Sequence, residues 1–87
     1  MTIPEIVSKY RGEKSLREFV ADLNSKISEP LSHQTIKDWE DGKYPPSSRT
    51  ILPIAIQYSD WRRKFALDIL AVLDPNLYGP DQLTLIS

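Results

Sequence analysis

Residues 31–43 read Leu-Ser-His-Gln-Thr-Ile-Lys-Asp-Trp-Glu-Asp-Gly-Lys, and this stretch predicts a short helix with a cap at each end. Ser32 can accept a hydrogen bond from the free backbone N–H groups of the first turn, and Gly42 supplies the left-handed residue with which helices end. Ile36 and Trp39 are three residues apart, so both turn inward. The polar side chains of this helix are therefore expected to face outward.

The outward side chains carry hydrogen-bond donors and acceptors. A helix that exposes such groups from its N-terminal half can lie in the major groove of DNA, where each base pair presents a distinct pattern. The predicted base-contacting residues are His33, Gln34, Thr35, Lys37 and Asp38. The alternative for each is a solvated surface position. Asp38 would repel phosphate but can accept a hydrogen bond from cytosine N4.

The same stretch resembles the recognition helix of the Cro/lambda-repressor (XRE) helix-turn-helix family. That family's pattern is an apolar residue, Ser or Thr, three polar positions, Ile, and then Trp-Glu-x-Gly-Lys. Residues 15–23 (SLREFVADL) resemble the family's first motif helix, and residues 46–52 (PSSRTIL) resemble the start of its next helix. The resemblance implies an all-α, compact bundle of four to five helices. The helix-turn-helix would span about residues 15–41 and insert helix 32–41 in the major groove.

The resemblance also implies where the phosphate backbone lies, beside the start of the second helix and beside the segment after the recognition helix. The residues expected there are Lys14, Ser15, Arg17, Lys43, Tyr44 and Arg49. Ser15 would cap a helix N-terminus that faces a phosphate. In the family, the Glu after the aromatic residue pairs with a basic residue of helix one. Glu40 is therefore expected to pair with Lys9, with Arg11 as the next choice.

Local signals place the first two helices. Thr2 and Glu5 form a capping box at the start of a helix over about residues 3–11, and Ser15 and Glu18 form a second one. The segment that follows, 24–30, is about six residues longer than the turn usual in the family. Two accounts are possible: the second helix continues to about residue 27, or a surface loop lies beside the groove.

The last two helices follow from capping residues and prolines. A fourth helix begins at Ser47 or Ser48, and Pro53 is expected to kink or interrupt it, because proline removes a helical hydrogen bond. Asp60 caps a fifth helix that runs to about Leu73 and ends at the Asp-Pro pair that follows.

The fifth helix is apolar on more than one stripe, so more than one surface must bury it. Phe65, Ile69 and Leu73 are expected to close the core, which leaves Leu67 and Leu70 for another surface. Two outcomes fit this pattern. The helix and the apolar tail at 83–86 form a homodimer, or the tail folds back over the helix.

Composition limits the remaining possibilities. The 87-residue chain is expected to hold one domain at 1–75 and a tail at 76–87 that takes part in the dimer. No apolar run approaches the roughly 20 residues of a membrane span and no signal peptide is visible, so a cytoplasmic location is expected. Without cysteine and with a single histidine, no metal site, cofactor or small-molecule ligand is evident. No nucleophile and base are spaced for catalysis, so we expect no enzyme.

The formal net charge of −1 predicts modest DNA affinity for each subunit, strongly weakened by salt. The sequence thus predicts a small sequence-specific transcriptional regulator, repressor-like, that binds double-stranded DNA as a homodimer. The alternative is a protein-interaction module, antitoxin-like or a phage adaptor, that keeps the fold without specific DNA binding. An acidic or loop-covered surface around Gln34 would favour that alternative.

Overall fold

The first four helices each begin at a hydroxyl side chain that accepts a hydrogen bond from the backbone N–H three residues further on. The capping residues are Thr2, Ser15, Ser32 and Ser47. The full capping box is present at Thr2 and Glu5. At Ser15 only half of the predicted box forms, because within residues 2–73 the Glu18 carboxylate makes no return bond to the Ser15 backbone.

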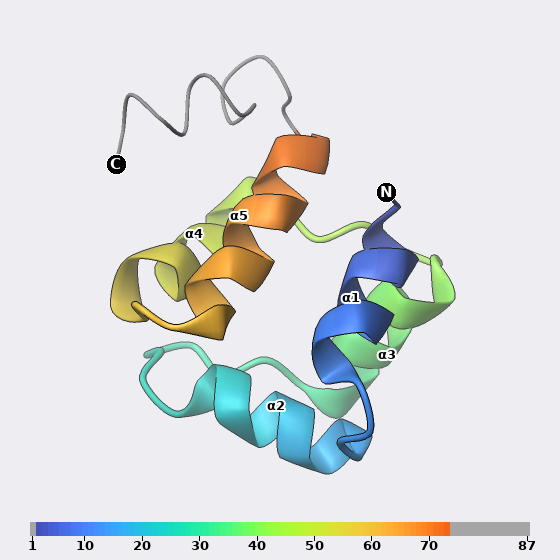
Figure 1. The fold of residues 1–87 in the computed structure, drawn as a ribbon, viewed down its shortest axis with the longest axis horizontal. Helices are drawn as coiled ribbons and strands as arrows, with labels where there is room; N and C mark the ends of the chain where they lie inside the picture. Colours follow the sequence, from blue (N-terminus) through green and yellow to red (C-terminus); the bar gives the residue numbers. More distant parts are fainter. Residues whose placement is uncertain (1, 74–87) are drawn as a thin grey trace.

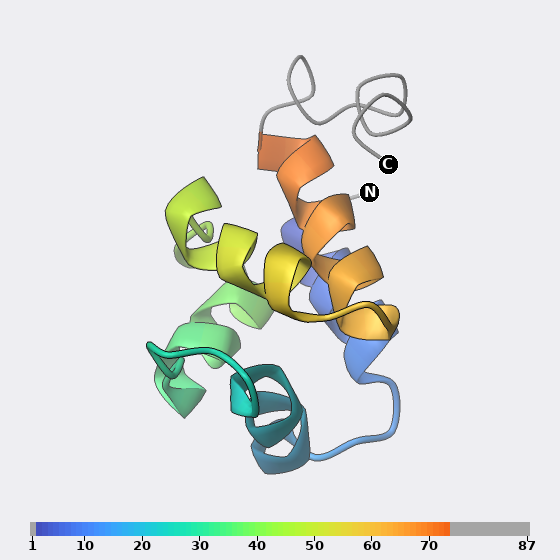
Figure 2. The same cartoon turned by 90° about the vertical axis from the view of Figure 1, so that its left-hand side faces the viewer.

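A computed structural model describes residues 2–73 and shows five helices and no strand in that range (Figures 1 and 2). The helices are α1 (Ile3–Arg11), α2 (Leu16–Asn24), α3 (His33–Asp41), α4 (Ser48–Gln57) and α5 (Trp61–Leu73). The predicted all-α bundle of four to five helices is confirmed. The predicted tail at 76–87, and the Asp-Pro pair expected to end the fifth helix, lie outside the described residues.

The predicted interruption at Pro53 is wrong, because α4 continues through this residue. The ring lies on the exposed side of the helix. Ile51 and Ile54 on the opposite side are completely buried and hold α4 against the core. The packing of these two side chains outweighs the one helical hydrogen bond that proline removes.

All five helices contribute to one core, and α4 and α5 pack against each other with their axes at a steep angle (Figure 2). Trp39 is 3% exposed, which confirms its predicted place in the core. The prediction for α5 is partly wrong. Leu70 is fully buried beside Phe65 and Ile69, and Leu67 is half-buried against the same core. Most of the second apolar stripe of α5 is therefore buried in the core of the same chain.

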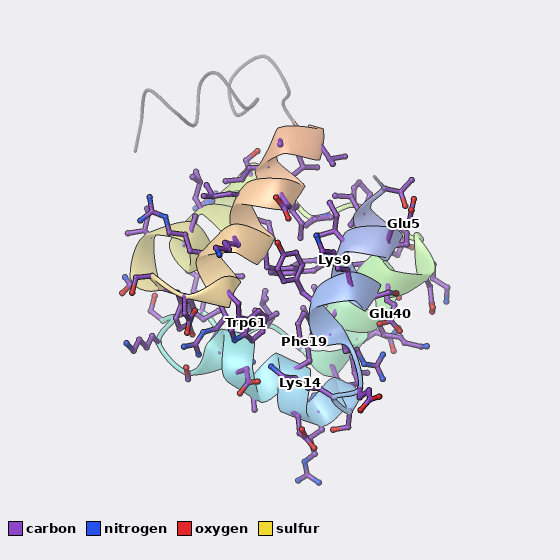
Figure 3. The ribbon with its side chains drawn as sticks, viewed as in Figure 1. Glu5, Lys9, Lys14, Phe19, Glu40 and Trp61 are labelled. Atoms are coloured by element: carbon purple, nitrogen blue, oxygen red, sulfur yellow. The ribbon has the colours of Figure 1, made fainter. Side chains whose placement is uncertain are left out.

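Aromatic rings connect the first two helices to α5. The Phe19 ring contacts Trp61, with ring centroids 5.9 Å apart (Figure 3). It also contacts Phe65 at 5.5 Å, and Tyr10 packs edge-on against Phe65. The Tyr10 hydroxyl donates to Asp68 at 2.5 Å. Burial, together with this bond to the carboxylate, raises the pKa of Tyr10 to about 12.

Candidate nucleic-acid interface

The orientation of α3 is fixed by an ion pair with the end of α1. The Arg11 guanidinium donates to both carboxylate oxygens of Glu40, at 2.7 and 2.8 Å. The first choice, Lys9, is wrong, and the second choice, Arg11, is the partner. Both of these bonds come from Nη1, while Arg11 Nε donates to the Lys14 carbonyl at 3.1 Å and so helps to hold the guanidinium in place. The Lys9 ammonium lies 5.3 Å from the Tyr10 ring centroid.

The C-terminal end of α3 turns sharply at Gly42, whose φ of 76° is left-handed. The Gly42 N–H donates to the Trp39 carbonyl and the Lys43 N–H to the Asp38 carbonyl, at 3.3 and 3.0 Å. This pair of bonds is the Schellman arrangement that ends helices. It leaves the Lys43 and Tyr44 side chains exposed directly after α3, and Tyr44 is 67% exposed.

The outward face of α3 consists of polar side chains, some of which bond to each other. Gln34 Nε2 donates to Asp38 Oδ1 at 2.8 Å, and Lys37 pairs with Asp41 at 3.5 Å. His33, Gln34 and Lys37 are exposed, and Asp38 is half-buried. These four predicted residues therefore share one surface.

Thr35, the fifth predicted base contact, also takes part in the N-terminal cap of α3. Its hydroxyl lies 2.8 Å from the Ser32 hydroxyl, and its backbone N–H donates to the same oxygen at 3.0 Å. The side chain is half-buried and completes the N-terminal cap of α3. We therefore assign Thr35 a capping role.

The predicted phosphate contacts separate into two groups. Arg17 and Lys43 are exposed and make no side-chain hydrogen bond or ion pair within residues 2–73. The Lys14 ammonium, in contrast, lies 3.0 Å from the Asp22 carboxylate and 4.0 Å from the Trp61 ring centroid. Lys14 is thus held against α2 and α5 (Figure 3).

The lengthened turn between α2 and α3 is a surface loop, because α2 ends at Asn24. Both polar atoms of the Asn24 side-chain amide bond to the backbone of Leu31. Nδ2 donates to the carbonyl at 2.8 Å, and Oδ1 accepts from the N–H at 2.7 Å. The half-buried Leu31 side chain packs against the core. The first of the two accounts, a second helix that continues to about residue 27, is therefore wrong, and the segment is the surface loop of the second account.

Two residues beyond α4 cap the C-terminal end of α2, which has no glycine there. The Tyr58 hydroxyl donates to the Leu23 carbonyl at 2.8 Å and accepts from the Lys26 N–H at 2.9 Å. Arg62 donates to the Asp22 carbonyl at 2.9 Å while its guanidinium lies 3.9 Å from the Tyr58 ring centroid. This cap was not predicted from the sequence. The absence of a glycine after α2 could have indicated that side chains from elsewhere in the chain cap this helix end.

Asp60 holds Arg62 in this position. Its carboxylate accepts from the Arg62 backbone N–H at 3.0 Å, which confirms the predicted cap of α5, and from the guanidinium at 2.6 Å. The side-chain hydrogen bonds from Arg62 lower the pKa of Asp60 to about 2. The pair therefore stays ionised at neutral pH and keeps Arg62 on the end of α2.

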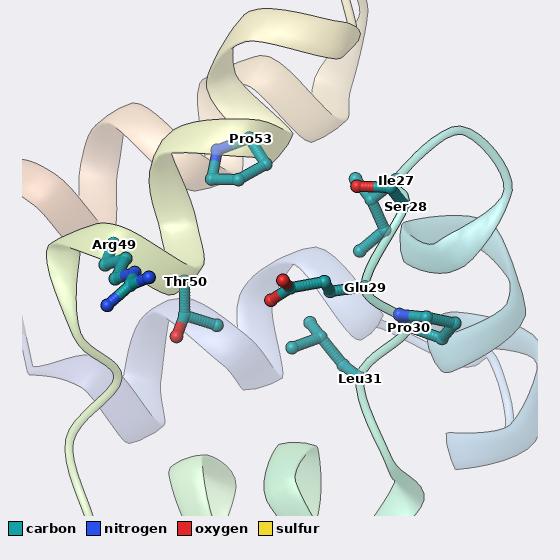
Figure 4. Close-up of a pocket in the computed structure, with 8 residues that line it drawn as sticks. All are labelled: Ile27, Ser28, Glu29, Pro30, Leu31, Arg49, Thr50 and Pro53. Carbon is teal, nitrogen blue, oxygen red and sulfur yellow. The ribbon is translucent and has the colours of Figure 1, made fainter.

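A groove of about 430 Å³ lies between the loop and the start of α4 (Figure 4). One wall is the loop, with Ile27, Glu29 and Leu31, and the other is α4. Arg49, a predicted phosphate contact, lies on the α4 wall with Pro53. The groove thus brings this arginine beside the loop.

Within residues 2–73, no three His, Cys, Asp or Glu side chains gather as a metal site would require. No helix in the same range combines the length and the apolar character of a membrane-spanning segment. Comparisons of the chain with protein-family models, with curated proteins and with solved structures found no match.

Proposed function

We propose that this chain is a small sequence-specific DNA-binding transcriptional regulator of the helix-turn-helix type, with α2 and α3 as the motif. The observation that carries the proposal is the outward face of α3. Its exposed polar side chains begin in the first turn of a helix that is capped at both ends. Arg17 and Lys43 flank it without partners in the described part of the chain. Such a helix fits the major groove.

In this mechanism Gln34, with His33, Lys37 and Asp38, contacts base edges. The N-terminus of α2 at Ser15, together with Arg17, Lys43 and Tyr44, fixes the register on phosphates. Lys14 is left out because Asp22 and Trp61 hold its ammonium. Bound to an operator in the cytoplasm, the protein would block or recruit other proteins. A dimer would contact two half-sites.

The charges of α3 limit the affinity of one subunit. Helix α3 carries Lys37 together with Asp38, Glu40 and Asp41, and within residues 2–73 only Glu40 pairs with a cation on another helix. Acidic groups beside phosphate weaken binding, and salt screens the remaining attraction. Two subunits on one operator would compensate, which is why the proposal includes a homodimer.

The same acidic residues favour a second candidate, a protein-interaction module that keeps the bundle and binds no specific DNA. In that case Gln34 and Asp38, bonded to each other at 2.8 Å, would form part of a surface for a partner protein. The loop beside α3 would widen that surface.

Selection from a pool of random duplexes, followed by binding of the enriched duplex across a salt series, tests the proposal. A regulator enriches a defined site, and the logarithm of its affinity falls linearly with the logarithm of salt concentration. Enrichment of no sequence would contradict the proposal and favour the interaction module.

A further inference from the structure

The groove between the loop and α4 has opposite charges on its two walls. Glu29 projects from the loop toward α4, and Arg49 lies on the α4 wall (Figure 4). Neither side chain makes an ion pair with another residue in the range 2–73. The groove is also lined by the apolar side chains Ile27, Leu31 and Pro53.

An exposed apolar side chain stands beside this groove on α4. Ile56 is 73% exposed, which is more than Tyr44 at 67% or Val72 at 41%. It follows Pro53 by three residues, so both lie on the same face of the helix. This face therefore carries a projecting apolar group next to a groove whose walls are partly apolar.

The loop wall is fixed by contacts within the chain. Asn24 holds Leu31 through two hydrogen bonds, and Tyr58 holds the N–H of Lys26. A groove that exists before its partner arrives loses little conformational freedom on binding. The groove is thus suited to a folded protein surface.

We propose that a second copy of this chain occupies the groove, related to the first by a twofold axis. In a twofold interface each contact occurs twice with the roles exchanged. Glu29 of one protomer then pairs with the partner's Arg49, and Arg49 pairs with the partner's Glu29. Ile56 of each protomer enters the apolar part of the other groove. The surface carries Glu29 and Arg49, and it carries both the projecting Ile56 and the groove that receives it. Two copies of this surface are therefore complementary to each other.

This interface differs from the one predicted on the fifth helix and the tail. On α5, within the described residues, Val72 is the exposed large apolar side chain, because the core covers the others. The inference deepens the proposed function by naming the surface of its homodimer. It is tested without DNA, so that failure of dimerisation and failure of DNA binding are separate results.

Sedimentation of the full-length chain across a concentration series is the measurement. The wild type should form a dimer at high concentration. Glu29→Lys and Arg49→Glu each place like charges opposite one another, and each should raise the dissociation constant by about tenfold or more. Glu13→Lys and Lys64→Glu change the same charges at exposed positions outside the groove and should leave it unchanged.

An equimolar mixture of the Glu29→Lys and Arg49→Glu variants gives the most specific test of the proposed ion pairs. In the mixed dimer the introduced lysine faces the introduced glutamate, and the remaining Arg49 faces the remaining Glu29. The mixture should therefore dimerise at least about tenfold more tightly than either variant alone. Circular dichroism of each variant is the control, and an unchanged helical spectrum would show that loss of the dimer does not come from unfolding.

The apolar contact has its own control. Ile56→Asp should abolish the dimer, whereas Val72→Asp should leave it intact. Three results would overturn the inference: a wild type that stays monomeric at millimolar concentration, a mixture that associates no better than its components, or a dimer lost with Val72→Asp and kept with Ile56→Asp. The last of these would place the dimer on α5.

Discussion

Helices α3 and α4 have similar inward faces and different outward faces. Inward, Ile36 of α3 and Ile51 of α4 are completely buried. Outward, α3 exposes polar side chains such as Gln34, whereas α4 exposes Ile56. Polar groups stay hydrated in a nucleic-acid groove, but an exposed isoleucine is stabilised only when another apolar surface covers it. The difference is what the two proposals require, with DNA as the partner of α3 and a second protomer as the partner of α4.

Removal of the core support beneath α3 should have the largest effect. Trp39→Ala should lower the free energy of unfolding by about 3–5 kcal/mol, as large-to-small core substitutions do. Chemical denaturation followed by circular dichroism measures the loss. Tyr44→Ala removes an exposed ring five residues later and should change stability by less than about 0.5 kcal/mol. Equal losses in the two variants would mean that Trp39 does not support the core as assigned.

Loss of the ion pair that orients α3 should have a smaller effect. Glu40→Gln removes the charge that accepts both bonds from Arg11, and should cost about 1.5–3 kcal/mol in denaturation measurements. Lys9→Met tests the competing pairing and should stay within about 0.5 kcal/mol of the wild type. If Lys9→Met were the more damaging change, the assigned partner of Glu40 would be incorrect.

The flanking cation Lys43 should affect DNA binding without affecting sequence preference. Lys43→Ala removes one phosphate contact, so the slope of log affinity against log salt should become shallower by about one unit. Titrations of the selected duplex and of a random duplex at several salt concentrations measure both slopes. Lys14→Ala is the control, because Asp22 and Trp61 already hold that ammonium. An unchanged slope in Lys43→Ala would remove this residue from the interface.

The smallest predicted effect concerns alkaline pH. The pKa of Tyr10 is about 12 in the folded chain and 10.0 ordinarily, so folding favours the protonated hydroxyl. This contribution to stability is complete below pH 10 and is lost as pH rises from about 10 through 12. Melting temperatures over that range should fall more steeply for the wild type than for Tyr10→Phe. Parallel curves would show that the bond to Asp68 contributes nothing to this dependence.

Local signals in the sequence were sufficient for most of the helices. The caps at Thr2, Ser32 and Ser47 act within three residues, so their effect does not depend on the rest of the fold. The interruption at Pro53 and the outward position of Leu70 were predicted wrongly. Burial of Ile51 and Ile54 holds α4 together through Pro53, and Leu70 itself is buried in the core. Helical spacing alone cannot tell which of two neighbouring apolar stripes faces the core.

The groove could not have been predicted, because its walls depend on contacts between distant residues. Tyr58 and Arg62 cap a helix that ends more than thirty positions earlier. The sequence indicated only that the turn was too long. The outward position of Gln34 was predicted from spacing, and its bond to Asp38 follows from the separation of four residues. The role of both residues in DNA binding stays a prediction.

The most direct test of the central claim, that the outward face of α3 recognises base sequence, is a comparison of Gln34→Ala with the wild type on two duplexes. On the selected duplex the variant should lose about 1–3 kcal/mol of binding free energy, and on a random duplex it should lose almost nothing. Equal losses on the two duplexes, or no loss on either, would contradict the claim that Gln34 and its neighbours on α3 recognise the sequence.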